Sequence, residues 1–131
     1  MLVKTRLGPS AIEGFGLFAD EDIAKGTITW RFAPGFDLLF SDAELAALPA
    51  VVQSMMTNYT YLHQPTGKHV FCVDNARFMN HSDSPNTAGI HANGAIEGYD
   101  VATRDIVKGE ELTCDYLTFD GAAAEKLAPQ P

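Results

Sequence analysis

Residues 76–87 of the chain, ARFMNHSDSPNT, bring a guanidinium, an aromatic ring, an amide and an imidazole together in one short segment. The local pattern is typical of a turn, because Asn, Asp and Ser side chains bond to their own backbone. Pro85 also restricts the residue before it to an extended conformation. A turn alone does not require Arg77 and Phe78 before it or His81 within it, so the segment is a candidate for ligand contact.

Two kinds of chemistry fit His81 poorly. A metal site would need further ligands nearby, and no histidine follows His81 at two, three or four positions. A hydrolase would need a base that faces its nucleophile, whereas Ser82 and Ser84 lie beside His81 in the same loop, outside any nucleophile-elbow pattern. We therefore expect neither a bound metal nor a serine nucleophile here.

Two further segments carry chemical groups. Gly14-Phe15-Gly16 lacks the third glycine and the following helix of a dinucleotide-binding loop, but it would let the backbone approach a ligand closely. Residues 109–116, GEELTCDY, predict a strand that ends at Tyr116. Side-chain alternation on this strand would place Cys114 and Tyr116 on the same face. Taken alone, either segment could also be structural, as a bulge or as an edge strand with a core tyrosine.

The elements expected to position these segments are mostly strands. Alternating or β-branched runs predict strands at 2–7, 27–32, 68–73, 99–106 and 109–116. Ser41 and Glu44 have capping-box spacing and predict a helix start, and residues 51–61 continue as a second helical piece after Pro49. The last residues, 122–131, are expected to form a flexible tail.

One short pattern occurs twice. Residues 22–26 and 105–109 both read Asp-Ile-x-Lys-Gly, and each lies between two strand-like runs. Two copies this far apart do not indicate a solenoid. They predict a turn used twice, with glycine in the left-handed region before the returning strand.

Composition limits the function classes. With 131 residues, 46% of them hydrophobic, the chain is expected to form one soluble domain. The net charge of −8 disfavours nucleic-acid binding and favours a basic partner, although it could serve solubility alone. Cys72 and Cys114 are too few for a zinc cluster or a disulfide scaffold. The chain shows no apolar leader or membrane-length run, so we expect a cytoplasmic protein without membrane contact.

The three segments, EGFGLFADEDIAKGT, VDNARFMNHSDSPNT and GEELTCDY, occur in this order. Together they closely resemble the SET-domain family of protein lysine methyltransferases, from about Val3 to Phe119. The chain is similar to the minimal, stand-alone SET domains known in bacteria and viruses. The resemblance implies a mainly β fold, the SET β-clip of several small curved sheets, with short helices and a C-terminal pseudoknot. Residues 1–121 would form the SET domain.

The resemblance also implies a site. S-adenosylmethionine would be the methyl donor, and a basic, lysine-containing protein or peptide would be the acceptor. The donor would contact Gly14, Phe15, Gly16, Arg77, Phe78, Asn80 and His81. Tyr116 would be the catalytic residue, and Tyr61, Cys114 and Phe119 would contact the substrate lysine. For the tyrosines at 59 and 61, core packing is the alternative interpretation.

The chain departs from the family pattern in three ways. Asp83 stands where a cysteine commonly follows Asn-His-Ser, and no C-terminal zinc-binding cysteine cluster is present. Phe119 and the tail, or a second subunit in a homodimer, would have to close the substrate side instead. Cys114 stands where the family usually has Tyr or Phe, which predicts di- or trimethylated product. The alternative function is a non-catalytic SET module that binds peptide or S-adenosylmethionine.

Overall fold

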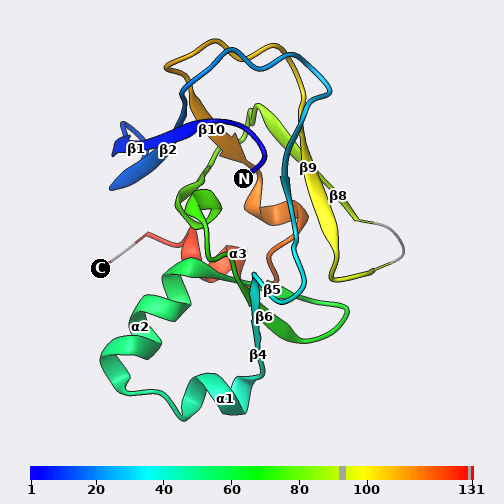
Figure 1. Cartoon of the computed structure of the whole chain (residues 1–131). Helices are drawn as coiled ribbons and strands as arrows, with labels where there is room; N and C mark the ends of the chain where they lie inside the picture. The colour runs from blue at the N-terminus through cyan, green and yellow to red at the C-terminus, as the bar shows by residue number, and fades with distance from the viewer. Residues whose placement is uncertain (92–93, 130) are drawn as a thin grey trace.

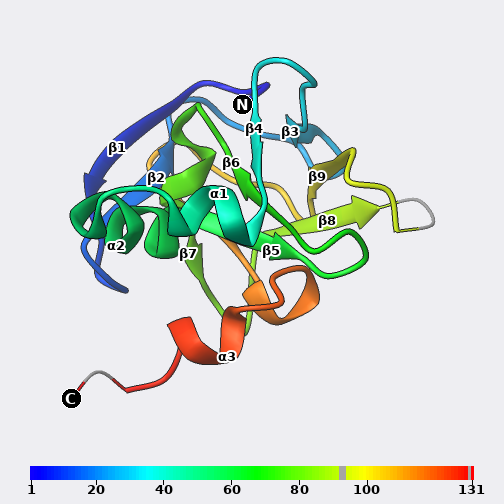
Figure 2. The same cartoon turned by 90° about the horizontal axis from the view of Figure 1, so that it is seen from below.

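Three small β-sheets surround the interior of the molecule (Figures 1 and 2). The computed structural model describes residues 1–91, 94–129 and 131. The strand orders are β1-β2-β10-β7, β3-β9-β8 and β4-β6-β5. The strands are β1 (Thr5–Pro9), β2 (Phe15–Ala19), β3 (Ile28–Arg31), β4 (Leu38–Phe40), β5 (Thr60–His63), β6 (Lys68–Phe71), β7 (Asn80–His81), β8 (Thr87–His91), β9 (Gly98–Ala102) and β10 (Glu111–Cys114). The prediction of a mainly β fold made of small sheets is confirmed.

The helices are short and lie at the periphery. They are α1 (Asp42–Ala46), α2 (Ala50–Tyr59) and α3 (Ala123–Lys126), with two 3₁₀ turns, η1 (Asn75–Phe78) and η2 (Tyr116–Thr118). The predicted capping box is present, because Ser41 Oγ accepts from the Glu44 backbone and the Glu44 carboxylate accepts from the Ser41 backbone. Helices α1 and α2 extend away from the sheets (Figure 1), and α3 lies near the C-terminus on the opposite side of the β5–β6 hairpin from α1 (Figure 2).

The C-terminal strand β10 lies between β2 and β7. It pairs antiparallel with β2 and parallel with β7, where Thr113 faces Asn80 and Cys114 faces His81. The buried side chain of Asn86 also forms hydrogen bonds with the backbone of β10. Its amide donates to the Glu111 carbonyl at 2.8 Å and accepts from the Thr113 amide at 2.9 Å. The segment that contains Asn80 and the segment that contains Thr113 lie far apart in the sequence and are therefore joined through their backbones.

The repeated pentapeptides lie against each other. Ile23 and Ile106 form an antiparallel bridge with two backbone hydrogen bonds of 2.8 Å. Each aspartate caps the other copy, since Asp105 accepts from the Lys25 amide at 2.8 Å and Asp22 accepts from the Lys108 amide at 2.9 Å. Both glycines have positive φ, 84° at position 26 and 96° at position 109, as predicted. The repeat thus forms a reciprocal pair of turns, with both isoleucines buried in the core under β2 and β10.

Several expectations about local structure were wrong. The segment at 38–40, the segment after α2 and residues 87–91 form strands that the sequence patterns did not indicate. The predicted strand at 109–116 ends at Cys114. Asp115 stops it by accepting a hydrogen bond from the Leu117 amide, and Tyr116 then begins the turn η2. Because Tyr116 lies outside the strand, strand alternation does not place the side chains of Cys114 and Tyr116 on the same face.

Replacing Ile106 with Ala should destabilise the fold by about 2–5 kcal/mol, because the side chain is 1% exposed and its removal leaves a cavity in the core. The neighbouring Val107, 56% exposed, provides the control, and its replacement by Ala should change the stability by less than ~0.5 kcal/mol. Urea unfolding of both variants measures the difference. Equal losses of stability in the two variants would contradict the placement of Ile106 in the core.

Candidate functional site

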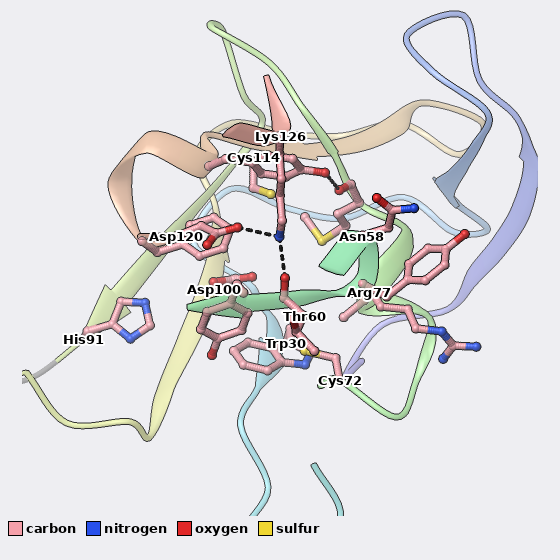
Figure 3. A pocket seen from close by; sticks show the side chains of 16 residues that line it. Trp30, Asn58, Thr60, Cys72, Arg77, His91, Asp100, Cys114, Asp120 and Lys126 are labelled. Carbon is pink, nitrogen blue, oxygen red and sulfur yellow. Dashed lines mark hydrogen bonds and ion pairs between the residues drawn. The ribbon is translucent and has the colours of Figure 1, made fainter. Parts of the chain in front are cut away.

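Two pockets meet beside the end of α2 and the tail helix α3. The narrow pocket encloses about 80 Å³ and the wide pocket about 630 Å³. Figure 3 shows the side chains that line the narrow pocket. The two pockets share a wall made of Asn58, Tyr59, Arg77, Met79, Tyr116 and Lys126. A reaction between two ligands, one in each pocket, would therefore take place at this wall.

The site residues predicted from the sequence separate between the two pockets. The wide pocket is lined by Gly14, Phe15, Arg77, Phe78, Asn80 and His81, whereas Gly16 does not line it. The narrow pocket is lined by Tyr61, Cys114 and Phe119, whereas Arg77 and Tyr116 line both pockets. Apart from Gly16 and Arg77, the residues assigned to the donor and to the substrate line different pockets, which share Tyr116.

The two glycines of the first loop have different roles. Gly14 has a φ of 48°, in the left-handed region that side chains disfavour. Gly16 leaves room for Glu111, since a Cβ at Gly16 would lie 2.2 Å from Oε1 of that carboxylate. Ser10 donates to the same carboxylate at 2.9 Å. The loop is therefore shaped by one backbone requirement and one close side-chain contact.

The Asn80 amide holds this loop in place. Its Nδ2 lies 3.1 Å from the Glu13 carbonyl, 3.2 Å from the Phe15 carbonyl and 2.9 Å from Oε1 of Glu111. These acceptors occupy the donor end of the amide, so a ligand in the wide pocket would meet the arranged loop rather than this group. Sequence patterns did not indicate Glu111, because its role depends on its contact with Gly16 and Asn80.

His81 positions Tyr116. The Tyr116 amide donates to Nδ1 of His81 at 3.2 Å, so in the neutral ring the proton lies on Nε2, which is 3.1 Å from Asp83. The centroids of the two rings are 5.4 Å apart. This contact explains why an imidazole with two different ring nitrogens suits position 81.

The Tyr116 hydroxyl lies at the wall between the pockets. It donates to the Met79 carbonyl at 2.6 Å, and burial raises the pKa of the hydroxyl above its usual range. The Phe119 ring lies edge-on to two tyrosines, with centroid distances of 6.1 Å to Tyr116 and 5.3 Å to Tyr61. The hydroxyl is therefore protonated at neutral pH and held among aromatic rings.

Arg77 is tied to its own turn. Its Nη1 donates to the Val73 and Asp74 carbonyls at 2.8 and 2.9 Å, and its guanidinium lies 4.7 Å from the centroid of the Phe78 ring. The Phe78 ring is 5.2 Å from that of Tyr59. Arg77 and Phe78 thus line the wide pocket as a packed unit.

The narrow pocket contains polar atoms without partners. Within the described part of the chain, buried Trp30 Nε1, Tyr61 Oη and His91 Nδ1 form no hydrogen bond. Asp100 lines the same pocket, and burial raises the pKa of its carboxyl to about 6. Buried polar groups are usually paired, so unpaired ones lining a cavity suit a polar ligand. The sequence alone did not indicate Trp30, His91 or Asp100.

A model of the SET-domain family matches residues 14–117. The chain belongs to the SET-domain family. The matched region extends from the first glycine loop to just beyond Tyr116 and leaves out strand β1 and the tail helix α3. A comparison with curated proteins found no match.

Solved SET-domain structures share the fold. A candidate histone methyltransferase from Plasmodium falciparum superposes with a TM-score of 0.62 at 22% identity, covering 88% of this chain and 95% of that one. Polycomb Repressive Complex 2 from Chaetomium thermophilum, in an autoinhibited conformation bound to S-adenosylmethionine, gives a TM-score of 0.69 at 25% identity. That match covers 97% of this chain but 17% of the other, so this chain corresponds to about a sixth of it.

Two further observations concern other ligands and membranes. Among residues 1–91, 94–129 and 131, no group of three or more His, Cys, Asp or Glu side chains is arranged to hold a metal ion. None of the helices in these ranges has the length and apolar character needed to cross a bilayer.

Replacing Gly16 with Ala should destabilise the fold by ~1–3 kcal/mol, because the new Cβ must displace the Glu111 carboxylate. A double-mutant cycle with Glu111→Ala isolates this contact. Thermal or urea unfolding should show that Gly16→Ala costs markedly less stability once the carboxylate is gone. If the stability losses of the two substitutions simply add, the contact with Glu111 does not explain why position 16 is a glycine.

Replacing Asp100 with Asn should stabilise the protein at pH 8. Because the folded-state pKa is raised to about 6, folding loses stability as the pH rises from about 4 through about 6, and the amide avoids this loss. A shift of this size corresponds to roughly 3 kcal/mol at most. Urea unfolding at pH 4 provides the control, since the gain should vanish there. A gain that does not depend on pH would contradict the burial of an ionised carboxylate.

Proposed function

We propose that this protein is a protein-lysine N-methyltransferase that uses S-adenosylmethionine and acts on a lysine in a basic protein or peptide. The observation that carries the proposal is the position of Tyr116 on the wall shared by the two pockets. Membership of the SET-domain family supports it, as does the S-adenosylmethionine bound to the Chaetomium relative. The donor would occupy the wide pocket and the acceptor lysine the narrow one.

The wide pocket fits a donor of this kind. The first loop, held by Asn80, and the unit of Arg77 and Phe78 form two of its sides, and exposed Phe15 would pack along the ligand. The bound donor supplies an electrophilic methyl group on a positively charged sulfur. The chain would supply alignment, since an in-line displacement requires the reacting atoms about 3–3.5 Å apart.

The narrow pocket would have to receive a lysine without its proton. At pH 7 about one free lysine in 2,500 is neutral, which corresponds to a cost of roughly 4.6 kcal/mol. Desolvation by the walls of Tyr61, Tyr116 and Phe119 would disfavour the ammonium form and lower this cost. The net charge of −8 would attract a basic substrate to the mouth of the pocket.

Tyr116 would act by orienting the reactants. Its hydroxyl keeps its proton because burial raises its pKa, so the neutral tyrosine is no general base in the resting site. Its hydrogen bond to the Met79 carbonyl fixes the oxygen, whose lone pairs can accept from an incoming amine.

Two measurements test the function. Calorimetric titration should show stoichiometric binding of S-adenosylmethionine, and donor with a radiolabelled methyl group should label lysines in purified core histones. Binding without any transfer would favour the alternative, a non-catalytic SET module. No binding at all would overturn the proposal.

Tyr116→Phe should keep donor affinity within about three-fold but lose most of kcat, because the hydroxyl acts at the reacting centre. Asn80→Ala should show the opposite pattern, weaker donor binding, because the loop at 13–15 loses its anchor. Calorimetry and initial rates on the two variants separate these effects. Wild-type turnover in Tyr116→Phe would contradict the assignment of this residue.

Cys114→Tyr should shift the product towards monomethyl-lysine. Cys114 lines the narrow pocket and is 8% exposed, and its small thiol leaves volume beside the amine. The wild-type enzyme is therefore expected to add two or three methyl groups. Intact-mass analysis of a methylated peptide measures the product, and urea unfolding controls for overpacking, which costs ~1–3 kcal/mol. A wild-type product that stops at one methyl would contradict this role.

A further inference from the structure

The tail helix α3 and the two residues that flank it form part of both pockets. Ala122, Glu125 and Leu127 line the wide pocket alone, whereas Lys126 lines both. This helix lies beyond residue 117, where the match to the family ends. The tail thus places a lysine of this chain at the wall where the proposed donor and acceptor would meet.

The amine of Lys126 lies on the substrate side of that wall. Nζ donates to the Thr60 carbonyl and lies 2.7 Å from Oδ2 of Asp120 (Figure 3). Thr60 and Asp120 both line the narrow pocket and not the wide one. The Lys126 side chain is 16% exposed and that of Asp120 is 2% exposed. Two partners that belong to one pocket therefore define the location of the amine.

Asp120 is itself fixed in position. Its second oxygen accepts from the Leu62 amide and from the Ala122 amide, both at 2.9 Å. The carboxylate therefore links β5 to the start of α3 and presents its remaining oxygen to Lys126. The amine rests against a preformed acceptor inside the pocket, not against a mobile surface group.

The other lysines of the chain have different surroundings. Lys4, Lys25, Lys68 and Lys108 are exposed, and none of them lines either pocket. Lys126 is thus the lysine that shares a pocket with Tyr116. An acceptor attached to the same chain also reaches the site at a high effective concentration.

We propose that Lys126 is a methyl acceptor of this protein, modified by its own active site. The inference rests on the proposed methyltransferase function. The Lys126 ammonium first leaves Asp120 and loses one proton to solvent. The Nζ lone pair then forms a bond to the donor methyl carbon, while the carbon–sulfur bond breaks and its electron pair stays on sulfur, leaving a neutral thioether. The methylated amine regains its positive charge and can pair with Asp120 again.

The structure of α3 is compatible with this movement. The helix has four residues, and a helix this short has little stability of its own. The ion pair of Lys126 with Asp120 and the bond to Thr60 are the side-chain contacts that hold Lys126. Self-methylation therefore requires local release of one side chain, with no change in the sheets.

The location of the amine can be tested without any donor. Brief treatment with acetic anhydride, followed by peptide mass mapping, should modify the four exposed lysines at least ten-fold faster than Lys126. The exposed lysines are the internal control, and unfolding in urea should abolish the difference. Equal reactivity of Lys126 in the folded protein would overturn the inference, because the amine would then not lie in the pocket.

The modification is tested with S-adenosylmethionine as the only added reagent, in parallel with reactions that also contain purified core histones. Wild-type protein should gain methyl mass at Lys126, at a rate per molecule that does not depend on protein concentration. Lys126→Arg keeps the positive charge but removes the acceptor and should gain none.

Each other outcome is informative. Labelled histones with unmodified Lys126 would overturn the self-methylation and leave the proposed function intact. Absence of transfer to either acceptor would overturn both. Methylation spread over the exposed lysines, or undiminished in Lys126→Arg, would overturn Lys126 as the acceptor.

Discussion

The insertion of β10 between β2 and β7 is the constraint on which both pockets depend. Asn86 satisfies backbone groups of Glu111 and Thr113 on this strand, and Thr87 donates to the Thr113 carbonyl at 2.8 Å. Because buried polar groups must be paired, these bonds leave one register for the strand. That register determines where the chain leaves the sheet and turns at Asp115, and hence where Tyr116 lies.

The same arrangement joins the two halves of the proposed site. The strand that positions Tyr116 also carries Glu111, whose carboxylate meets Asn80 and the space left by Gly16. Strand β10, which leads to Tyr116, is therefore also hydrogen-bonded to the first loop through Glu111 and Asn80. The first loop leads into β2, and β2 and β10 are neighbours in the same sheet.

The tail changes how the substrate side is understood. The resemblance left Phe119 with the tail, or a second subunit, as the alternatives for closing this side. In the structure, Phe119 packs on Tyr61 and Tyr116, and α3 adds Lys126 to the wall. The half-buried carboxylate of Asp100 and the buried carboxylate of Asp120, which pairs with Lys126, line the same pocket.

Local sequence determined the features that need few residues. The capping box at Ser41, the turn glycines at 26 and 109, and the three motifs with their order could be read from the chain, because each depends on short-range geometry or on a distinctive spacing. The resemblance carried by those motifs predicted the mainly β fold and the family. It also divided the site residues into a donor group and a substrate group, a division that stays a prediction; Gly16 of the donor group lines neither pocket, and Arg77 lines both.

Tertiary structure decided what depends on contacts between distant residues. No local pattern could show that the two pentapeptides cap each other, that Glu111 requires glycine at position 16, or that the last strand stops at Cys114. Lys126 is the clearest case, because in sequence it is an ordinary lysine near a chain end. Its partners Thr60 and Asp120 lie 66 and 6 residues away, and only the folding of α3 against β5 brings its amine into the pocket.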